Sequence, residues 1–198
     1  MTDESKTIRD VLGQIDARLF QSYVNPTVEH LDSIISAGIS APTWEPKTNR
    51  PADAKAYIYD VLLALVLVHS EVSTTASTMT GQILSYLLEQ ASLSLINAFK
   101  QRPRYSLAAL MQATLDVEFL AQTLNNYTTD RAGETQSQIY LALDERTDND
   151  ARAKLQGELP QMRGVLKGLR EGTRGEFGCF KKDRGTARGR EKGGSKVA

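Results

Sequence analysis

Cysteine and histidine are almost absent from this sequence. Its 198 residues contain one cysteine, Cys179, and two histidines, His30 and His69. A single cysteine excludes an internal disulfide and fits a reducing compartment. So few ligands also leave a Cys/His zinc site unavailable. We therefore predict neither a disulfide nor a metal site.

Motifs that bind phosphate or activate a nucleophile are missing as well. The glycine-rich stretch near the C-terminus reads GLREGTRGEFG; it lacks the Gly-Lys-Ser/Thr ending of a phosphate loop and follows no strand. None of the serines lies in a nucleophile elbow. The sequence therefore predicts a protein that is not an enzyme, with no catalytic residue, no cofactor and no small-molecule substrate.

Three groups of residues could still carry chemistry, but each has a simpler interpretation. His69 lies two residues before Glu71, and residues two apart on a helix point to different sides, which favours a histidine at the polar edge of a core helix. Asp116 and Glu118 have the same spacing and are expected at a solvated edge. Basic neighbours could lower the pKa of the Cys179 thiol, although no histidine is near it in the sequence.

The main apolar run is too short to cross a membrane. Residues 61–68 are apolar without a break, whereas a spanning helix needs about 20 apolar residues. Asp60 precedes the run, and His69 and Glu71 follow it. We predict a buried core helix here. We expect no signal peptide at the N-terminus, because MTDESKTIRD is polar and acidic.

Charge is unevenly distributed, although the formal net charge is zero. Residues 161–198 contain eleven Lys/Arg and four Asp/Glu, whereas residues 1–160 contain thirteen and twenty. The body is acidic and the C-terminal part is basic.

Residues 183–198 are expected to form a basic, disordered tail. Their few apolar side chains cannot offset the entropy that ordering the chain would cost. Such a tail could attract anionic lipid, at about 1 kcal/mol per basic residue, bind nucleic acid non-specifically, or stay solvated without a partner. Without interleaved aromatic residues, specific nucleic-acid recognition is not favoured. The candidate interaction residues in and beside the tail are Lys181, Lys182, Arg184, Arg188 and Arg190.

Residues 1–39 show two helical apolar stripes separated by Asn25 and Pro26. The first helix is expected over residues 3–22. Asn25 as N-cap and Pro26 as first helical residue predict a second helix, which Gly38 ends. Two helices of this size expose more apolar surface than they can cover between themselves, so we expect them to pack on another part of the protein.

Residues 40–52 are predicted to form a loop. Pro42, Pro46 and Pro51 each remove a helical hydrogen bond and favour extended geometry in the residue before them. Trp44 has two interpretations. It could anchor an interface, because tryptophan is enriched at binding hot spots, or it could fold back onto its own domain, which is the more common case.

Residues 53–182 predict a bundle of successive helices. Asp53 or a neighbour is expected to cap the first, which reaches about residue 73; the next are expected near 83–99 and 105–127. A fourth follows the capping cluster at residues 128–130, and a fifth begins near Asp148, with a kink or short break at Pro160. No strand pattern is found, and short connections favour antiparallel neighbours. The predicted fold is all-α, a stacked antiparallel helical bundle.

Four segments of this helical series resemble the carboxy-terminal region of the Sec-five-type subunit of the exocyst, as found in fungal members. They are LLALVLVHSEVSTTA, LSYLLEQASLSLINAF, RPRYSLAALMQATLDVEFLAQTLNNYTT and ELPQMRGVLKGLREGTRGEFGCFKK. The resemblance covers roughly residues 19–182. Family members are several times longer, so we expect this chain to be a fragment without their amino-terminal coiled-coil region, and the tail after Asp183 has no counterpart.

The resemblance implies a segment of the helical rod that multisubunit tethering complexes share, with residues 1–39 belonging to the preceding bundle of the rod. Its partners would be the other exocyst subunits. Its work would be to tether secretory vesicles to the plasma membrane before fusion in exocytosis, as a cytoplasmic protein peripheral at these sites, on the route from the Golgi. The alternative function is peripheral membrane or nucleic-acid binding through the basic tail.

Overall fold

The described part of the chain contains six α-helices. A computed structural model describes residues 3–46 and 50–181, and within these ranges it contains no strand. The predicted all-α bundle is confirmed. The helices are α1 (Asp3–Ser40), α2 (Ala56–Thr75), α3 (Thr80–Lys100), α4 (Leu107–Thr123), α5 (Asp130–Glu145) and α6 (Asn149–Gly172), with the short 3₁₀ helices η1 (Ser77–Met79), η2 (Asn125–Tyr127) and η3 (Gly178–Phe180).

Three helices begin at side chains that cap them. The oxygens of Ser106, Thr129 and Asp148 each accept a hydrogen bond from the backbone N–H three residues later, at 3.2, 3.1 and 2.7 Å. Such caps satisfy backbone donors that the first turn of a helix leaves free. The predicted starts of the last two helices are confirmed. The predicted cap of α2 is wrong, because Asp53 instead accepts a hydrogen bond from the Tyr59 hydroxyl.

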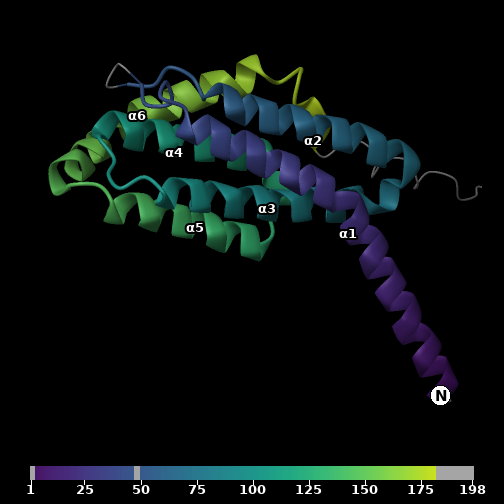
Figure 1. Ribbon diagram of the computed structural model, residues 1–198. Coiled ribbons are helices and arrows are strands. Elements are labelled where there is room, and N and C mark those ends of the chain that lie inside the picture. Colours follow the sequence, from purple (N-terminus) through teal and green to yellow (C-terminus); the bar gives the residue numbers. More distant parts are fainter. Residues whose placement is uncertain (1–2, 47–49, 182–198) are drawn as a thin grey trace, which may run out of the picture.

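The bundle is organised around α3. This helix packs against α1 and α5, and α4 packs against α6 (Figure 1). Helices α2 and α3 run antiparallel, because η1 and its neighbours turn the chain back between them (Figure 1). One continuous cluster of buried apolar side chains joins all six helices and η3.

The two helices predicted for residues 1–39 are one. Helix α1 continues through Pro26 and through Gly38 to Ser40. Pro26 has no backbone N–H, so the carbonyl group of Ser22 lacks its helical hydrogen-bond donor. Both residues are exposed. Water can therefore satisfy that carbonyl, while the apolar face of the helix stays unbroken on the opposite side.

The two halves of α1 lie in different surroundings. Side chains of the C-terminal half, such as Val24, Leu31 and Ile35, belong to the common core. The N-terminal half projects away from the bundle (Figure 1). The division of the chain into a preceding bundle, a loop, a main bundle and a tail stays a prediction, although the C-terminal half of α1 shares its core with residues 53–181.

Gly38 allows α1 to approach α2 closely. A Cβ atom at this position would clash with Cβ and Cγ of Tyr57 at the start of α2. Those atoms sit next to the backbone and cannot move aside cheaply. The prediction that Gly38 ends the helix is therefore wrong. Gly38 is instead the point at which α1 contacts α2.

The apolar run on α2 is buried on one side only. Ile58, Val61, Leu62 and Leu65 are fully buried, but Leu67 is 72% exposed. The prediction of a buried core helix is therefore wrong in part, because one side of the helix is exposed. By length and composition alone α2 could cross a membrane, a test that the core helix of a soluble protein also passes. Here it packs on α1 and α3.

Helix α6 runs through Pro160 without a break. Of the kink or short break that was predicted at this residue, the break is therefore wrong. Pro160 is exposed. After α6, Phe177 and Phe180 fold back onto the core, with their rings stacked at 6.5 Å. The described chain therefore ends packed against the bundle.

Replacing Gly38 by alanine should destabilise the protein by about 1–3 kcal/mol, because the added methyl group overpacks the contact with Tyr57. Gly13→Ala is the matched control on the same helix, since nothing lies within 4 Å of its Cβ position. Urea denaturation measures both. Equal stability of the two variants would contradict the close contact.

Replacing Leu65 by aspartate should unfold the bundle, because a buried charge without a partner costs several kcal/mol, comparable to total stability. Leu67→Asp introduces the same charge at an exposed position of the same helix and should melt close to the parent. Circular dichroism melting curves compare them. A Leu65→Asp variant that melts like the parent would mean that α2 is wrongly placed.

Candidate interaction surface

Neither His69 nor Cys179 is set up for catalysis. The His69 ring lies edge-on against Phe180, with ring centres 6.0 Å apart, in line with a histidine at the edge of a core helix. Burial raises the pKa of the Cys179 thiol, opposite to the lowering that its basic neighbours could have caused. A raised pKa keeps the thiol protonated and weakly nucleophilic.

Asp116 on α4 is fully buried, so the predicted solvated edge is wrong. Its Oδ1 accepts hydrogen bonds from the Lys55 backbone N–H at 3.0 Å and the Gln112 side-chain amide at 2.8 Å. Its Oδ2 accepts one from the Tyr57 hydroxyl at 2.9 Å. Lys55 is the N-cap residue of α2 and offers no side-chain cap. The carboxylate of Asp116 therefore holds the start of that helix.

Burial decides the electrostatics of this carboxylate. Desolvation raises the pKa of Asp116 to about 6, while the three hydrogen bonds oppose that rise. Burial and the nearby Asp116 charge also raise the pKa of Tyr57 well above its usual value. Neither Asp116 nor Tyr57 lines either of the two grooves described below. Asp116 serves the fold.

The described residues also lack a metal site. In residues 3–46 and 50–181, no group of three or more His, Cys, Asp and Glu side chains could hold a metal ion. Glu118, the second carboxylate of the predicted pair, accepts hydrogen bonds from the Tyr140 hydroxyl at 2.7 Å and the Gln122 amide at 2.8 Å. It too is engaged within the fold.

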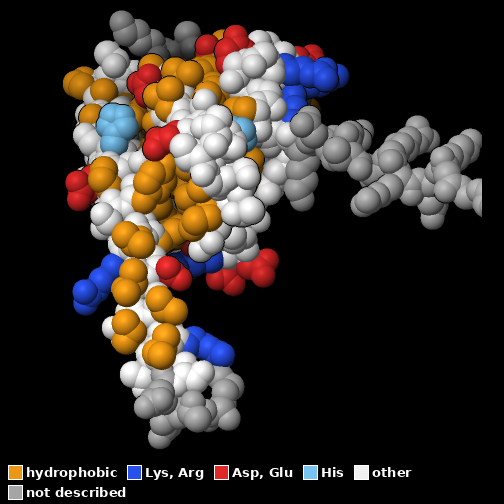
Figure 2. Space-filling view, turned by 90° about the vertical axis from the view of Figure 1, so that its right-hand side faces the viewer, with side chains coloured by type: hydrophobic (Ala, Val, Ile, Leu, Met, Phe, Trp, Pro, Cys, Tyr) orange, Lys and Arg blue, Asp and Glu red, His pale blue; other side chains and the backbone are white. Residues whose placement is uncertain are grey.

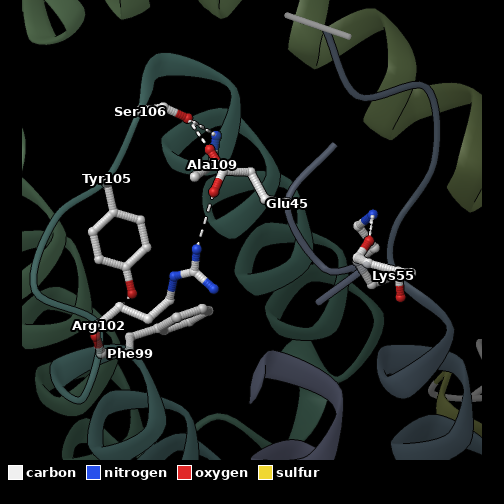
Figure 3. A network of polar contacts seen from close by, with 8 residues as sticks. Glu45, Lys55, Phe99, Arg102, Tyr105, Ser106 and Ala109 are labelled. Atoms are coloured by element: carbon white, nitrogen blue, oxygen red, sulfur yellow. Dashed lines mark hydrogen bonds and ion pairs between the residues drawn. The ribbon is translucent and has the colours of Figure 1, made fainter. Parts of the chain in front are cut away.

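Trp44 is buried and packs on its own domain, in agreement with the simpler of its two interpretations. It is 1% exposed, its ring centre lies 5.9 Å from that of Phe99, and the Arg102 guanidinium lies 4.8 Å above it. Arg102 also donates a hydrogen bond to Glu45 at 3.1 Å, and the hydroxyl of Ser106 donates another (Figure 3). These contacts fasten the loop before α2 onto the turn between α3 and α4.

The predicted basic candidates fall mostly outside the described chain. Lys181 is exposed at its end. The other four, Lys182, Arg184, Arg188 and Arg190, lie outside the described residues. A role for the basic tail therefore stays a prediction.

The most prominent surface feature is an apolar stripe on the projecting half of α1. Five large apolar side chains lie there between 47% and 64% exposed. Figure 2 shows them along the projecting helix. Four of them recur at spacings of four, three and four residues, the pattern of a helix that packs on another helix. The stripe consists of Ile8, Val11, Leu12, Ile15 and Leu19.

An apolar groove continues the stripe onto the bundle. It encloses about 810 Å³ where α1 leaves the bundle beside the end of α2 and the start of α3. Leu19 belongs to both the stripe and the groove, and Phe20 supports the wall through an edge-on contact with Tyr86 at 5.3 Å. The other apolar side chains of the groove are Ala17, Tyr23, Val72, Ala76, Met79 and Ile83.

The fold and this surface define a class of protein: an all-α module whose candidate site is a helix face for another protein. Contiguous apolar surface on a soluble protein usually marks such a contact. The chain belongs to the family of the exocyst complex component Sec5, whose family model matches residues 1–180. That family consists of non-enzymatic components of a complex, which confirms the prediction that the chain is not an enzyme.

Curated relatives agree with this family. The chain is similar to exocyst complex component 2 of Mus musculus and of Homo sapiens, each 26% identical over 133 residues. The alignment covers 67% of this chain and 14% of each relative. No solved structure matches the chain significantly. The resemblance to fungal members in particular, and the status of a fragment, stay predictions.

The sequence had signalled part of this surface. The excess apolar area of residues 1–39 was visible in the spacing of their side chains. The groove was not, because it forms only where α1 passes residues of α2 and α3 that lie about fifty or more positions away in the sequence. The engagement of Asp116 was missed for the same reason.

Replacing Asp116 by asparagine should flatten the dependence of stability on pH between about 4 and 6. Folding raises the pKa of Asp116 from 3.8 to about 6, so in this window the folded protein binds a proton that the unfolded chain has released. The free energy of unfolding of the parent therefore falls as pH rises through the window, by on the order of 3 kcal/mol. Urea denaturation at a series of pH values measures it.

Asp60→Asn is the control for this experiment, because Asp60 is exposed on α2. In this variant the free energy of unfolding should change with pH as it does in the parent, since Asp116 is present in both proteins. If Asp116→Asn and the parent show the same slope between pH 4 and 6, the raised pKa is wrong.

Proposed function

We propose that this chain is a segment of an exocyst subunit that helps tether secretory vesicles to the plasma membrane before fusion, through contacts between helices. Membership of the Sec5 family supports the exocyst assignment. The exposed stripe on α1 is the observation that supports the mode of action, because it leaves an apolar helix face without a partner in the described chain. We propose the other exocyst subunits as its partners.

The occupant that fits the stripe is an amphipathic helix. Ile8, Leu12, Ile15 and Leu19 follow one seam along about three turns, which is how one helix presents side chains to another. Burying a large aliphatic side chain contributes about 1.5–3 kcal/mol. Several such side chains can therefore offset the cost of ordering the projecting helix and its partner. The groove beside Leu19 extends the same contact onto the bundle.

The proposed place of action follows from the family and not from any chemistry in the fold. A subunit of this family would act in the cytoplasm, peripherally at sites of exocytosis, and so in transport from the Golgi to the plasma membrane. It supplies a binding surface and catalyses no step itself. The chain spans 14% of the relatives that it matches, so the activity of the whole protein is a proposal for this chain.

Replacing both Leu12 and Ile15 by serine should weaken binding to the other exocyst subunits at least tenfold, since about 1.4 kcal/mol corresponds to a factor of ten. The melting temperature of the bundle should not change, because both side chains are about half exposed and project from it. The measurement is co-purification with defined, co-expressed exocyst subunits from the same organism, followed by titration of the subunit that binds.

The matched control replaces Lys6 and Gln14 by serine. Both are exposed on the projecting half of α1, away from the seam, and the control introduces the same two serines. It should bind like the parent. If the stripe variant also binds like the parent, or if the stripe serves only to pair two copies of this chain in light scattering, the proposed mode of action is wrong.

A further inference from the structure

A second groove has a different chemical character. It encloses about 1070 Å³ where the end of α4 and η2 face the last turns of α6 and the segment that follows. Its lining contains four basic side chains and one acidic one, although the first 160 residues carry more acidic than basic groups. The basic side chains are Lys167, Arg170, Arg174 and Lys181, and the acidic one is Glu171.

The single acidic residue does little to neutralise the groove. Glu171 lies 3.9 Å from the Lys167 ammonium group, and the two side chains are 70% and 77% exposed. A pair that is so exposed is weak and strongly screened. In the described chain, neither Arg174 nor Lys181 forms an ion pair. Their charges remain available to a ligand.

Arg170 is held in position for binding. Its Nη1 donates a hydrogen bond to the Gln122 Oε1 atom at 3.1 Å, and the Gln122 amide donates to Glu118 at 2.8 Å. This chain of contacts fixes the guanidinium while using one of its five N–H donors. A side chain that is already ordered loses less entropy when a ligand binds.

The helix dipole explains only part of this cluster. Basic residues in the last turn of a helix are favourable because they face its negative end, which accounts for Arg170. Arg174 and Lys181 lie after α6 has ended at Gly172. The segment that folds back through Phe177 brings Arg174 and Lys181 to the same groove. The helix dipole does not explain why these two basic residues are there.

We propose that this groove binds a ligand that carries two or more phosphate groups. Arginine forks match phosphate oxygens in pairs, and lysines add point charges. The volume of about 1070 Å³ is slightly above the usual range for small-ligand sites, about 300–1000 Å³, and so leaves room for a phosphorylated polyol. The headgroup of a phosphorylated lipid and a soluble polyol phosphate share this chemistry. The site is independent of the helix contact proposed for α1.

The test titrates the 198-residue chain with inositol trisphosphate by calorimetry, and separately with phosphatidylcholine vesicles that contain phosphatidylinositol bisphosphate. The double variant Arg170→Gln, Arg174→Gln should bind the trisphosphate at least tenfold more weakly. Its matched control, Arg9→Gln with Arg18→Gln, removes the same charge from exposed positions of α1 and should bind like the parent. If the first variant misfolds by circular dichroism, Lys167→Gln with Lys181→Gln replaces it.

The outcomes separate the possible sources of binding. Trisphosphate binding without vesicle binding would support a soluble ligand, and binding of both would support a lipid headgroup. A chain that lacks residues 183–198 should still bind the trisphosphate. The proposal is overturned if the parent does not bind the trisphosphate, if the α1 control weakens binding equally, or if removal of residues 183–198 abolishes it.

Discussion

The buried carboxylate of Asp116 fixes the start of α2, and the position of α1 depends on that start. Asp116 receives the Lys55 backbone N–H and the Tyr57 hydroxyl. Tyr57 is also the residue that α1 contacts closely at Gly38. The hydrogen bonds of Asp116 therefore fix where α2 begins. The close contact between Gly38 and Tyr57 then fixes α1 relative to α2. The packing of α1 on α3 adds to these two contacts in placing α1 on the bundle.

The same helix is thus a core element at one end and a free surface at the other. Val24 is fully buried, whereas Leu19, little more than one turn earlier, is 64% exposed. Most helical stability in proteins comes from packing of the apolar face and not from the intrinsic helix propensity of the residues. The projecting half therefore has most to gain from a partner, which would supply the packing that the bundle gives to the rest of α1.

Local chemistry in the sequence predicted the helices well where the structure depends on local contacts. Thr129 and Asp148 cap helices because each bonds a backbone N–H only three residues away. Prediction failed where distant contacts decide. Pro26 does not end a helix, because the apolar face on the other side of α1 is packed on α3. Asp116 is buried because its partners Lys55 and Tyr57 lie about sixty residues earlier in the chain, which no spacing rule on α4 reveals.

The buried polar groups stabilise the fold, and the candidate binding sites lie on the surface. Three donors engage Asp116 and two engage Glu118, so both carboxylates take part in contacts that hold the fold. The two surfaces differ in what drives binding: apolar area on the α1 stripe, and charge in the basic groove, which salt weakens. They are built from different elements, so occupancy of one does not block the other. The tethering role that we propose requires contact with two partners at once, and separate surfaces of unlike chemistry meet that requirement.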